Sequence, residues 1–277
     1  MFGIGGGFLM TPLLVFLGVP APVAVASMAG HVAASSTSSV LAYSATRGVD
    51  FRMGAVLAAG GAVGSVAGVE VFRWLRLAGQ ADLAVALAYL VFLGVIGSLM
   101  LWESLRALAR QRRGDPASAP QSRRPALLYA LPLKMRFPRS RLYISVLPPL
   151  LLGAFVGVLS AVMGVGGGFI LVPAMIYLLR MPASVVVGTS LFQIIITTAI
   201  TTVLQAGRNQ TVDILLTGLL VLGGVFGAQL GARASARVRA EELRVLLALI
   251  ILGVGLFMGI RLVLTPTDPF VLLPLGG

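Results

Sequence analysis

The sequence predicts an all-α polytopic membrane protein made of two homologous halves. Of its 277 residues, 58% are hydrophobic and only 11% are charged, whereas a soluble domain has about 25% charged residues. The mean hydropathy is +0.99. A surface with so few charges must face lipid, so we expect the lipid bilayer to be the main partner of the chain. An internal duplication predicts the two halves.

The duplication is visible in a ten-residue motif. Residues 3–12 read GIGGGFLMTP, and residues 164–173 read GVGGGFILVP. Matches continue downstream in the same order, and they include Asp50 with Asp213, and Gly60, Gly61, Gly64 and Gly68 with Gly223, Gly224, Gly227 and Gly231. A repeat of this length is half a protein rather than one unit of a solenoid.

The repeat divides the chain into three parts. Residues 1–102 form the N-terminal half, residues 142–277 form the C-terminal half, and residues 103–141 form a linker with ten Lys or Arg and two acidic residues. The positive-inside rule predicts that this basic linker is cytoplasmic. The second motif follows an apolar lead-in, Leu142 to Met163, whereas the first motif begins at Gly3. We therefore expect the N-terminal half to lack a lead-in helix.

The elements of the N-terminal half follow from hydropathy. Phe8–Leu17 is apolar but has ten residues, and a full span needs about 20, so it predicts a short re-entrant or broken helix. Val23–Ala45 is long enough to span, but its many Ser residues predict an interior position. Met53–Trp74 has glycines at four-residue spacing that favour close helix packing, and Asp82–Trp102 is an ordinary apolar span.

The C-terminal half repeats this plan. After the lead-in, its short, polar, Gly-rich and final apolar segments are Phe169–Leu179, Ser184–Ala206, Asp213–Ala232 and Leu243–Leu264. Asp50 and Asp213 each precede a predicted helix, where N-capping is the simplest role. With five crossing elements to a full half, the second half is inverted relative to the first. The charge rule favours this arrangement because it keeps the arginines of residues 233–244 on the linker side.

The repeated motif suggests an anion site. A glycine run before a helix leaves backbone N–H groups free, the helix dipole adds partial positive charge, and a ligand can approach glycine closely. The hydroxyl-rich helices that follow would add donors. The candidate substrate-binding residues are Gly5, Gly6, Gly7, Phe8, Ser27, His31, Ser35, Gly166, Gly167, Gly168, Phe169, Thr189, Ser190, Gln193 and Thr197.

Two plainer interpretations stay open. The glycines would also allow two helices to cross tightly, with no ligand involved. His31 lies within a predicted span and matches Gln193 in the repeat, so it could bind an anion, carry a proton, or form a hydrogen bond between helices.

Other function classes lack the residues they need. The chain has no Cys, a single His and nine acidic residues, so we expect no enzyme activity, no metal site and no cofactor. The formal net charge of +12 would suggest nucleic acid for a soluble protein, but basic residues in the loops of a membrane protein set its topology. No nucleic-acid partner is expected.

The duplicated G-x-GGGF-x-x-x-P motif, the PAPVAVAS run of residues 20–27 and the basic linker resemble the TauE/SafE family of sulfite exporters. The resemblance implies a multi-pass transporter of the bacterial inner membrane that exports sulfite, organosulfonates or related small anions. With the predicted repeats, it favours a secondary transporter that works by alternating access. The alternatives are a passive anion channel or a non-transporting membrane scaffold, and the sequence leaves a homo-oligomer open.

Overall fold

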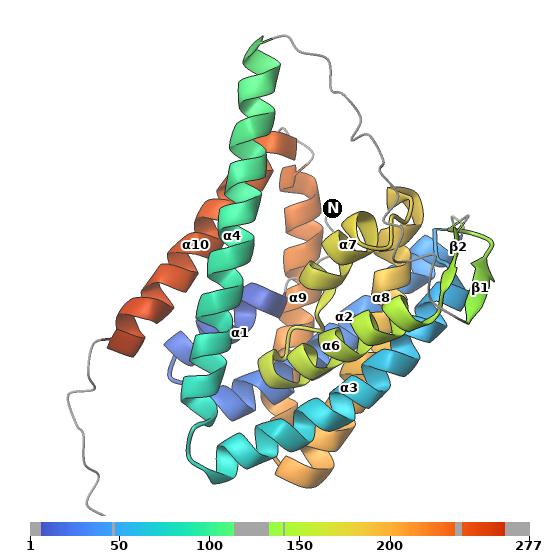
Figure 1. Ribbon diagram of the computed structural model, residues 1–277. Coiled ribbons are helices and arrows are strands. Elements are labelled where there is room, and N and C mark those ends of the chain that lie inside the picture. The colour runs from blue at the N-terminus through green and yellow to red at the C-terminus, as the bar shows by residue number, and fades with distance from the viewer. Residues whose placement is uncertain (1–6, 46–47, 114–132, 141, 236–239, 264–277) are drawn as a thin grey trace, which may run out of the picture.

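The computed structural model describes residues 7–45, 48–113, 133–140, 142–235 and 240–263. The fold is an all-α membrane bundle (Figure 1). The N-terminal half contains α1 (Gly7–Phe16), α2 (Ala21–Ala45), α3 (Phe51–Leu77) and α4 (Ala81–Arg113). The C-terminal half contains α6 (Leu147–Met163), α7 (Gly168–Tyr177), α8 (Ala183–Leu204), the π-helix η1 (Gln205–Asn209), α9 (Ile214–Ser235) and α10 (Ala240–Val263). A hairpin of β1 (Lys134–Phe137) and β2 (Leu142–Ser145) precedes α6.

The helix bounds follow the hydropathy of the chain. Within the described residues, three helices are long and apolar enough to cross a membrane, at Phe51–Leu77, Ala81–Leu99 and Ser184–Asn209. α1 and α7 have ten residues each, as expected for short elements. The helix α4 continues to Arg113, beyond the expected end at Trp102, and the lead-in begins with a strand so that α6 has 17 residues.

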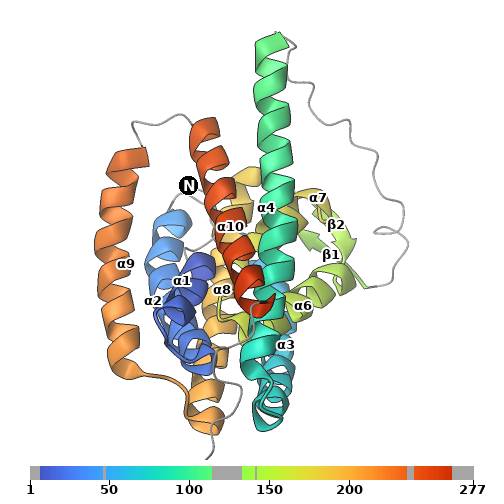
Figure 2. The same cartoon turned by 90° about the vertical axis from the view of Figure 1, so that its left-hand side faces the viewer.

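The bundle exposes apolar side chains where lipid is expected. α4 packs against α10, and both lie on the same flank of the molecule (Figures 1 and 2). The outer face of α4 carries a stripe of exposed apolar residues at four-residue spacing: Leu83, Leu87, Val91, Val95 and Leu99. Helical residues four apart share one face. This stripe is the surface that a bilayer would cover.

Glycine packing joins α3 to α6 across the two halves. A methyl group added at Gly64 would overlap the carbonyl group of Ala154, and one added at Gly153 would overlap the carbonyl oxygen of Leu57. Only glycine lets the two backbones come this close. The four-residue glycine spacing of α3 therefore serves close helix packing, as the sequence predicts.

The matching glycines of α9 have a different environment. α9 lies at the outer edge of the bundle (Figure 2). Among the described residues, nothing comes within 4 Å of a methyl group added at Gly223 or Gly227, which match Gly60 and Gly64 of α3. The described part of the chain thus contains no helix on α9 that corresponds to α6 on α3.

The hairpin is attached to the start of α3. Asp50 caps α3 by accepting hydrogen bonds from the backbone N–H groups of Arg52 and Met53, both at 3.2 Å, as expected of an N-cap. Its other carboxylate oxygen accepts from the N–H (2.9 Å) and hydroxyl (2.6 Å) of Ser140 in the hairpin turn. Asp213 accepts from the N–H of Leu216 at 3.0 Å, so the repeated Asp caps both Gly-rich helices.

Candidate functional site

The second glycine motif forms a tight loop between α6 and α7. Gly164, Gly166 and Gly167 have φ angles of 72°, 75° and 72°, a region that favours glycine over residues with a Cβ atom. The loop is fully buried, and α7 begins at Gly168. The sequence therefore requires glycine here for backbone conformation as well as for space.

The two motifs meet at one side chain. A methyl group added at Gly7, where α1 begins, would lie 2.6 Å from Cγ2 of Val32 and 3.7 Å from the carbonyl oxygen of Val165. A methyl group added at Gly166 would lie 2.8 Å from Cγ1 of the same Val32. The repeated glycines thus converge on α2 in the middle of the bundle. Gly5, Gly6 and the side chain of Phe8 lie outside the described residues.

Two apolar side chains, those of Val32 and Ile194, pack against Gly166 at this centre. Ile194 on α8 comes within 2.9 Å of a methyl group added at Gly166, and it packs in one buried cluster with Val32 and Met28. Val32 and Ile194 occupy matching positions in the repeat, because both follow the His31–Gln193 pair by one residue. Sequence reasoning missed them because apolar residues in a span look like ordinary core. Their positions beside a repeated polar pair were the signal that could have identified them.

Hydroxyl groups line α8 beside the glycine loop. Cγ2 of Thr198 lies 3.1 Å from a methyl group added at Gly166. The hydroxyls of Thr197, Thr198 and Thr201 donate to the carbonyls four residues earlier in α8, at 2.9, 2.7 and 2.9 Å. Back-bonding satisfies these donors inside a buried helix. A ligand that enters the centre would therefore find oxygen atoms that can rotate to donate to it.

Ser27 and Thr189 lie away from the centre, where they join the halves. The backbone N–H of Asp50 donates to Oγ1 of Thr189 at 2.9 Å. The matching contact joins the N–H of Asp213 to Oγ of Ser27 at 3.2 Å. Each half thus supplies a hydroxyl to the other half, and both hydroxyls are buried.

His31 and Gln193 also make matching contacts between the halves. His31 lies against Gly224 of α9, whose added methyl group would be 3.2 Å from Nε2 of His31. Gln193 lies against Gly61 of α3, and a methyl group added at Gly61 would be 2.7 Å from Nε2 of Gln193. Gly61 and Gly224 match in the repeat. Within the described part of the chain, Nδ1 of His31 and Oε1 of Gln193 are buried without a hydrogen-bond partner.

The remaining candidates lie on the flanks of the centre. The hydroxyl of Ser35 donates to the carbonyl of Val32 at 3.2 Å, and Ser190 donates to Val187 at 2.8 Å. Phe169 is buried and stacks edge-on against Phe92 of α4 at 6.0 Å. The structure therefore brings Gly7 and Gly166 together and distributes the polar candidates around them.

The groups at the site are suited to binding. Among the described residues, no group of three His, Asp or Glu side chains could hold a metal ion. The centre presents backbone groups, the side chain of Thr198 and apolar side chains. Such groups suit a small, partly desolvated ligand held by hydrogen bonds.

Comparison with known proteins agrees with this architecture. The chain is 28% identical over 262 residues to a "Probable membrane transporter protein" of Xylella fastidiosa (strain 9a5c), covering 93% of this chain and 88% of the relative. It is 25% identical over 270 residues to "Probable membrane transporter protein YunE" of Bacillus subtilis (strain 168), covering 92% and 90%. It is 26% identical over 260 residues to YjnA of the same organism, covering 92% and 91%.

No solved structure matches the chain. A protein-family model described as "Sulfite exporter TauE/SafE" matches residues 1–258, which is nearly the whole chain. Together with the apolar bundle and its duplicated glycine motif, this match makes the molecule a membrane transporter. The chain belongs to the TauE/SafE family of membrane transporters.

Proposed function

We propose that the chain is a secondary transporter that exports small sulfur-containing anions, such as sulfite or organosulfonates, by alternating access. The centre between Gly7, Val32, Gly166, Ile194 and Thr198 holds the anion. The family description supports the sulfur chemistry. The membrane is the bacterial inner membrane, and the basic linker of residues 103–141 is cytoplasmic.

The convergence of the two motifs on Val32 is the observation that carries this proposal. A glycine motif kept only for helix crossing needs no counterpart from the other half at the same place. Here Gly7 and Gly166 approach the same valine from two sides. The segments that lead into α1 and α7 then lie next to one buried position, where their backbone N–H groups would suit an anion with several acceptor oxygens.

The contacts between the halves support alternating access. Ser27 with Asp213 matches Thr189 with Asp50, and His31 with Gly224 matches Gln193 with Gly61. Such exchanged contacts fit two halves related by an approximate two-fold axis, which we take to lie in the membrane plane as in inverted repeats. Each half can then adopt the conformation of the other, which would open the centre to opposite sides in turn.

The closed centre favours a transporter over a passive channel. Val32, Ile194, Gly166 and Thr198 are buried, so the described state holds no open path at this point. Alternating access requires a closed centre in part of the cycle, whereas an open passive channel needs a continuous wet path.

The test is a flux assay with the full chain in liposomes. Sulfite, sulfoacetate, taurine and acetate are compared at matched ionic strength. We expect saturable sulfite or sulfonate flux that is stimulated by the same anion on the opposite side, because a carrier returns faster when loaded. Flux that rises linearly with concentration, without this stimulation, would establish the channel. Absence of flux for every sulfur anion would refute the proposed substrate class.

A matched pair of variants tests the location of the site. Thr198→Val keeps the methyl group that faces Gly166 and removes the hydroxyl of the same side chain. We expect KM for the anion to rise about tenfold, the value of one hydrogen bond. Thr37→Val removes an exposed hydroxyl of α2 that donates to the carbonyl of Ala33 at 2.8 Å, and KM should stay unchanged. Equal KM values in the two variants would move the site away from the glycine loop.

A further inference from the structure

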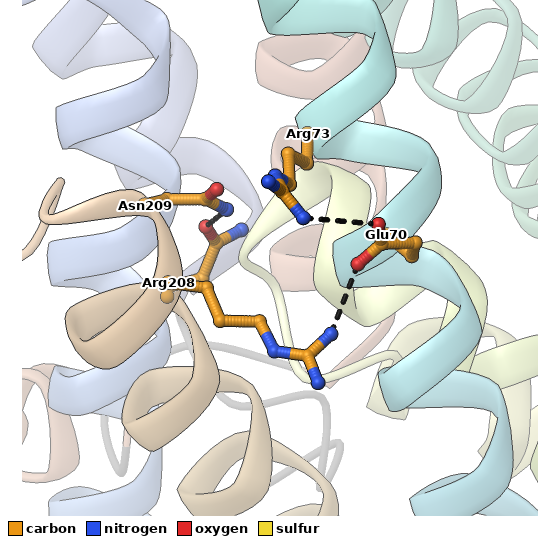
Figure 3. Close-up of polar contacts among 5 residues, drawn as sticks. Glu70, Arg73, Arg208 and Asn209 are labelled. Atoms are coloured by element: carbon orange, nitrogen blue, oxygen red, sulfur yellow. Dashed lines mark hydrogen bonds and ion pairs between the residues drawn. The ribbon is translucent and has the colours of Figure 1, made fainter.

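A cluster of three arginines and one glutamate lies where α3 ends beside the π-helix η1. Glu70 accepts from Nη1 of Arg208 at 2.9 Å and from Nη1 of Arg73 at 3.3 Å, so one carboxylate bridges α3 and η1 (Figure 3). The third arginine, Arg76, donates to the carbonyl oxygen of Asn209. The side chains of Arg73 and Arg208 are half exposed. The cluster is therefore partly accessible from outside the bundle.

Two buried amides continue inward from this cluster. Asn209, labelled in Figure 3, donates through Nδ2 to Oε1 of Gln205, and Nε2 of Gln205 donates to the carbonyl of Ala161 at 3.4 Å. Gln205 is fully buried and Asn209 is nearly so. Both amides come from η1, and π-helical turns are frequent at functional sites.

The inward end of this amide chain reaches the helical turn that carries the glycine loop. The carbonyl of Ser160 accepts from the N–H of Gly164, the first residue of the loop, at 2.8 Å. Ser160 precedes Ala161, the residue that Gln205 contacts, and the hydroxyl of Ser160 is buried without a partner among the described residues. The buried amides thus reach the last turn of α6, which leads into the glycine loop.

The charges of the cluster do not balance. Three arginines and one glutamate give a formal charge of +2 (3 − 1). The carboxylate of Glu70 accepts one N–H from Arg73 and one from Arg208. Each planar guanidinium group can bind an oxyanion through paired N–H donors. Glu70 therefore occupies the position that an external oxyanion would take.

We propose that this cluster is a binding site for small oxyanions at the membrane face opposite the linker, distinct from the glycine centre. The transported anion binds between Arg73 and Arg208 in competition with Glu70, beside the buried amides that lead to the glycine loop. This inference rests on the proposed function in one respect, because it takes the bound anion to be the anion that the protein transports. The ligand class is sulfur oxyanions and carboxylates, because the arginines recognise paired oxygens.

The test measures binding separately from transport. The sequence has two Trp, at 74 and 102, so Trp102→Phe leaves Trp74, which is the neighbour of Arg73, as the only tryptophan reporter. Its fluorescence is titrated with sulfite, sulfate and acetate at constant ionic strength in detergent. In this background we expect Arg208→Gln to weaken sulfite binding about two- to fivefold, and Glu70→Gln to strengthen it by a similar factor, the range of a half-exposed ion pair.

Glu70→Gln is the decisive variant, because a purely structural ion pair predicts a different result. If the cluster only holds α3 against η1, Glu70→Gln lowers thermal stability and leaves the dissociation constant of sulfite unchanged. Arg73→Gln serves as a second variant, because Arg73 is half exposed and its loss leaves the buried amides in place. The control is Arg52→Gln, an exposed arginine at the opposite end of α3, which should not change binding.

The outcomes separate this inference from the proposed function. Sulfite that binds with the expected variant effects but is not carried across liposomes supports the cluster and refutes sulfite transport. Sulfite that is transported with the same dissociation constant in wild type, Glu70→Gln and Arg208→Gln refutes the cluster and leaves the transport proposal standing. The binding site at the cluster is also refuted if none of sulfite, sulfate and acetate changes the fluorescence of Trp74 in the Glu70→Gln variant.

Discussion

Thr189 on α8 accepts a hydrogen bond of 2.9 Å from the backbone N–H of Asp50, the residue that caps α3. The same hydroxyl donates to the carbonyl of Val185 at 2.6 Å. Ser27 on α2 occupies the matching position and accepts from the N–H of Asp213 at 3.2 Å. The polar helix of each half therefore holds the first turn of the Gly-rich helix of the other half.

We predict that Thr189→Val destabilises the protein by about 1–3 kcal/mol, because it leaves the buried N–H of Asp50 without its partner. The measurement is thermal unfolding of the detergent-solubilised chain. Thr37→Val, on an exposed face of α2, is the control and should change the melting temperature little. If both variants unfold at the same temperature as the wild type, this contact between the halves contributes nothing to stability.

The glycines of α3 and α9 provide a second matched test. Gly64→Ala places a methyl group against the carbonyl of Ala154, whereas Gly227→Ala, the matching change in α9, meets nothing within 4 Å in the described structure. We expect Gly64→Ala to destabilise the protein by about 1–3 kcal/mol through overpacking. Gly227→Ala should be neutral or slightly stabilising, because alanine favours helix more than glycine does.

Thermal unfolding and the amount of folded protein in detergent measure this difference. A Gly227→Ala variant as unstable as Gly64→Ala would mean that another helix covers α9 in the membrane. In the described residues this glycine face of α9 is uncovered, so that result would indicate a partner for it that lies outside them.

Much of the fold followed from the sequence because it depends on local patterns. The duplication, the short elements, the polar helices and the caps at Asp50 and Asp213 all come from composition and spacing. The hairpin before α6 was not predicted. Its strands have four residues each, and its turn is held by Ser140 against Asp50, 90 residues earlier in the chain.

The site was predicted less completely for a similar reason. Helical spacing places Ser27 and His31 on one face of α2, but it does not say which helix that face meets. The structure directs His31 to Gly224 and Ser27 to Asp213, and it gives the central position to Val32. Only tertiary packing decides which residue of a helix points to the centre, and no local pattern encodes that choice.

Backbone conformation at the glycine loop gives a third prediction. Gly166→Ala combines a positive φ angle with contacts to Val32 and Ile194, whereas Gly18→Ala has a φ of 86° and nothing within 4 Å. Alanine in this region costs about 1–2 kcal/mol for conformation alone. We expect Gly18→Ala to retain anion flux with slightly lower stability.

Gly166→Ala should lose most of its flux, because the added methyl group also displaces the side chains that close the centre. Flux in liposomes, normalised to the amount of folded protein, measures the difference. If Gly166→Ala retains flux equal to that of Gly18→Ala, the loop requires glycine only for its conformation, and the binding role of the loop is refuted.

The last prediction concerns Tyr89, which connects α4 to the glycine loop. Its hydroxyl donates to the carbonyl of Met163, the residue before Gly164, at 2.6 Å, and the side chain is fully buried. Tyr89→Phe keeps the ring and leaves that carbonyl unpaired in an apolar setting. We expect a loss of about 1–3 kcal/mol in stability and a rise in KM for the anion, because the loop loses the contact that fixes its entrance.

The control for this prediction is Tyr143→Phe in β2, an exposed tyrosine outside the helical bundle. It should change neither the melting temperature nor KM. Thermal unfolding and liposome flux measured on the same preparations separate the two effects of Tyr89→Phe. A lower melting temperature with an unchanged KM would mean that Tyr89 stabilises the fold without positioning the loop. An unchanged melting temperature would mean that the Met163 carbonyl finds another donor, because a buried carbonyl left without a hydrogen bond lowers the stability of the fold.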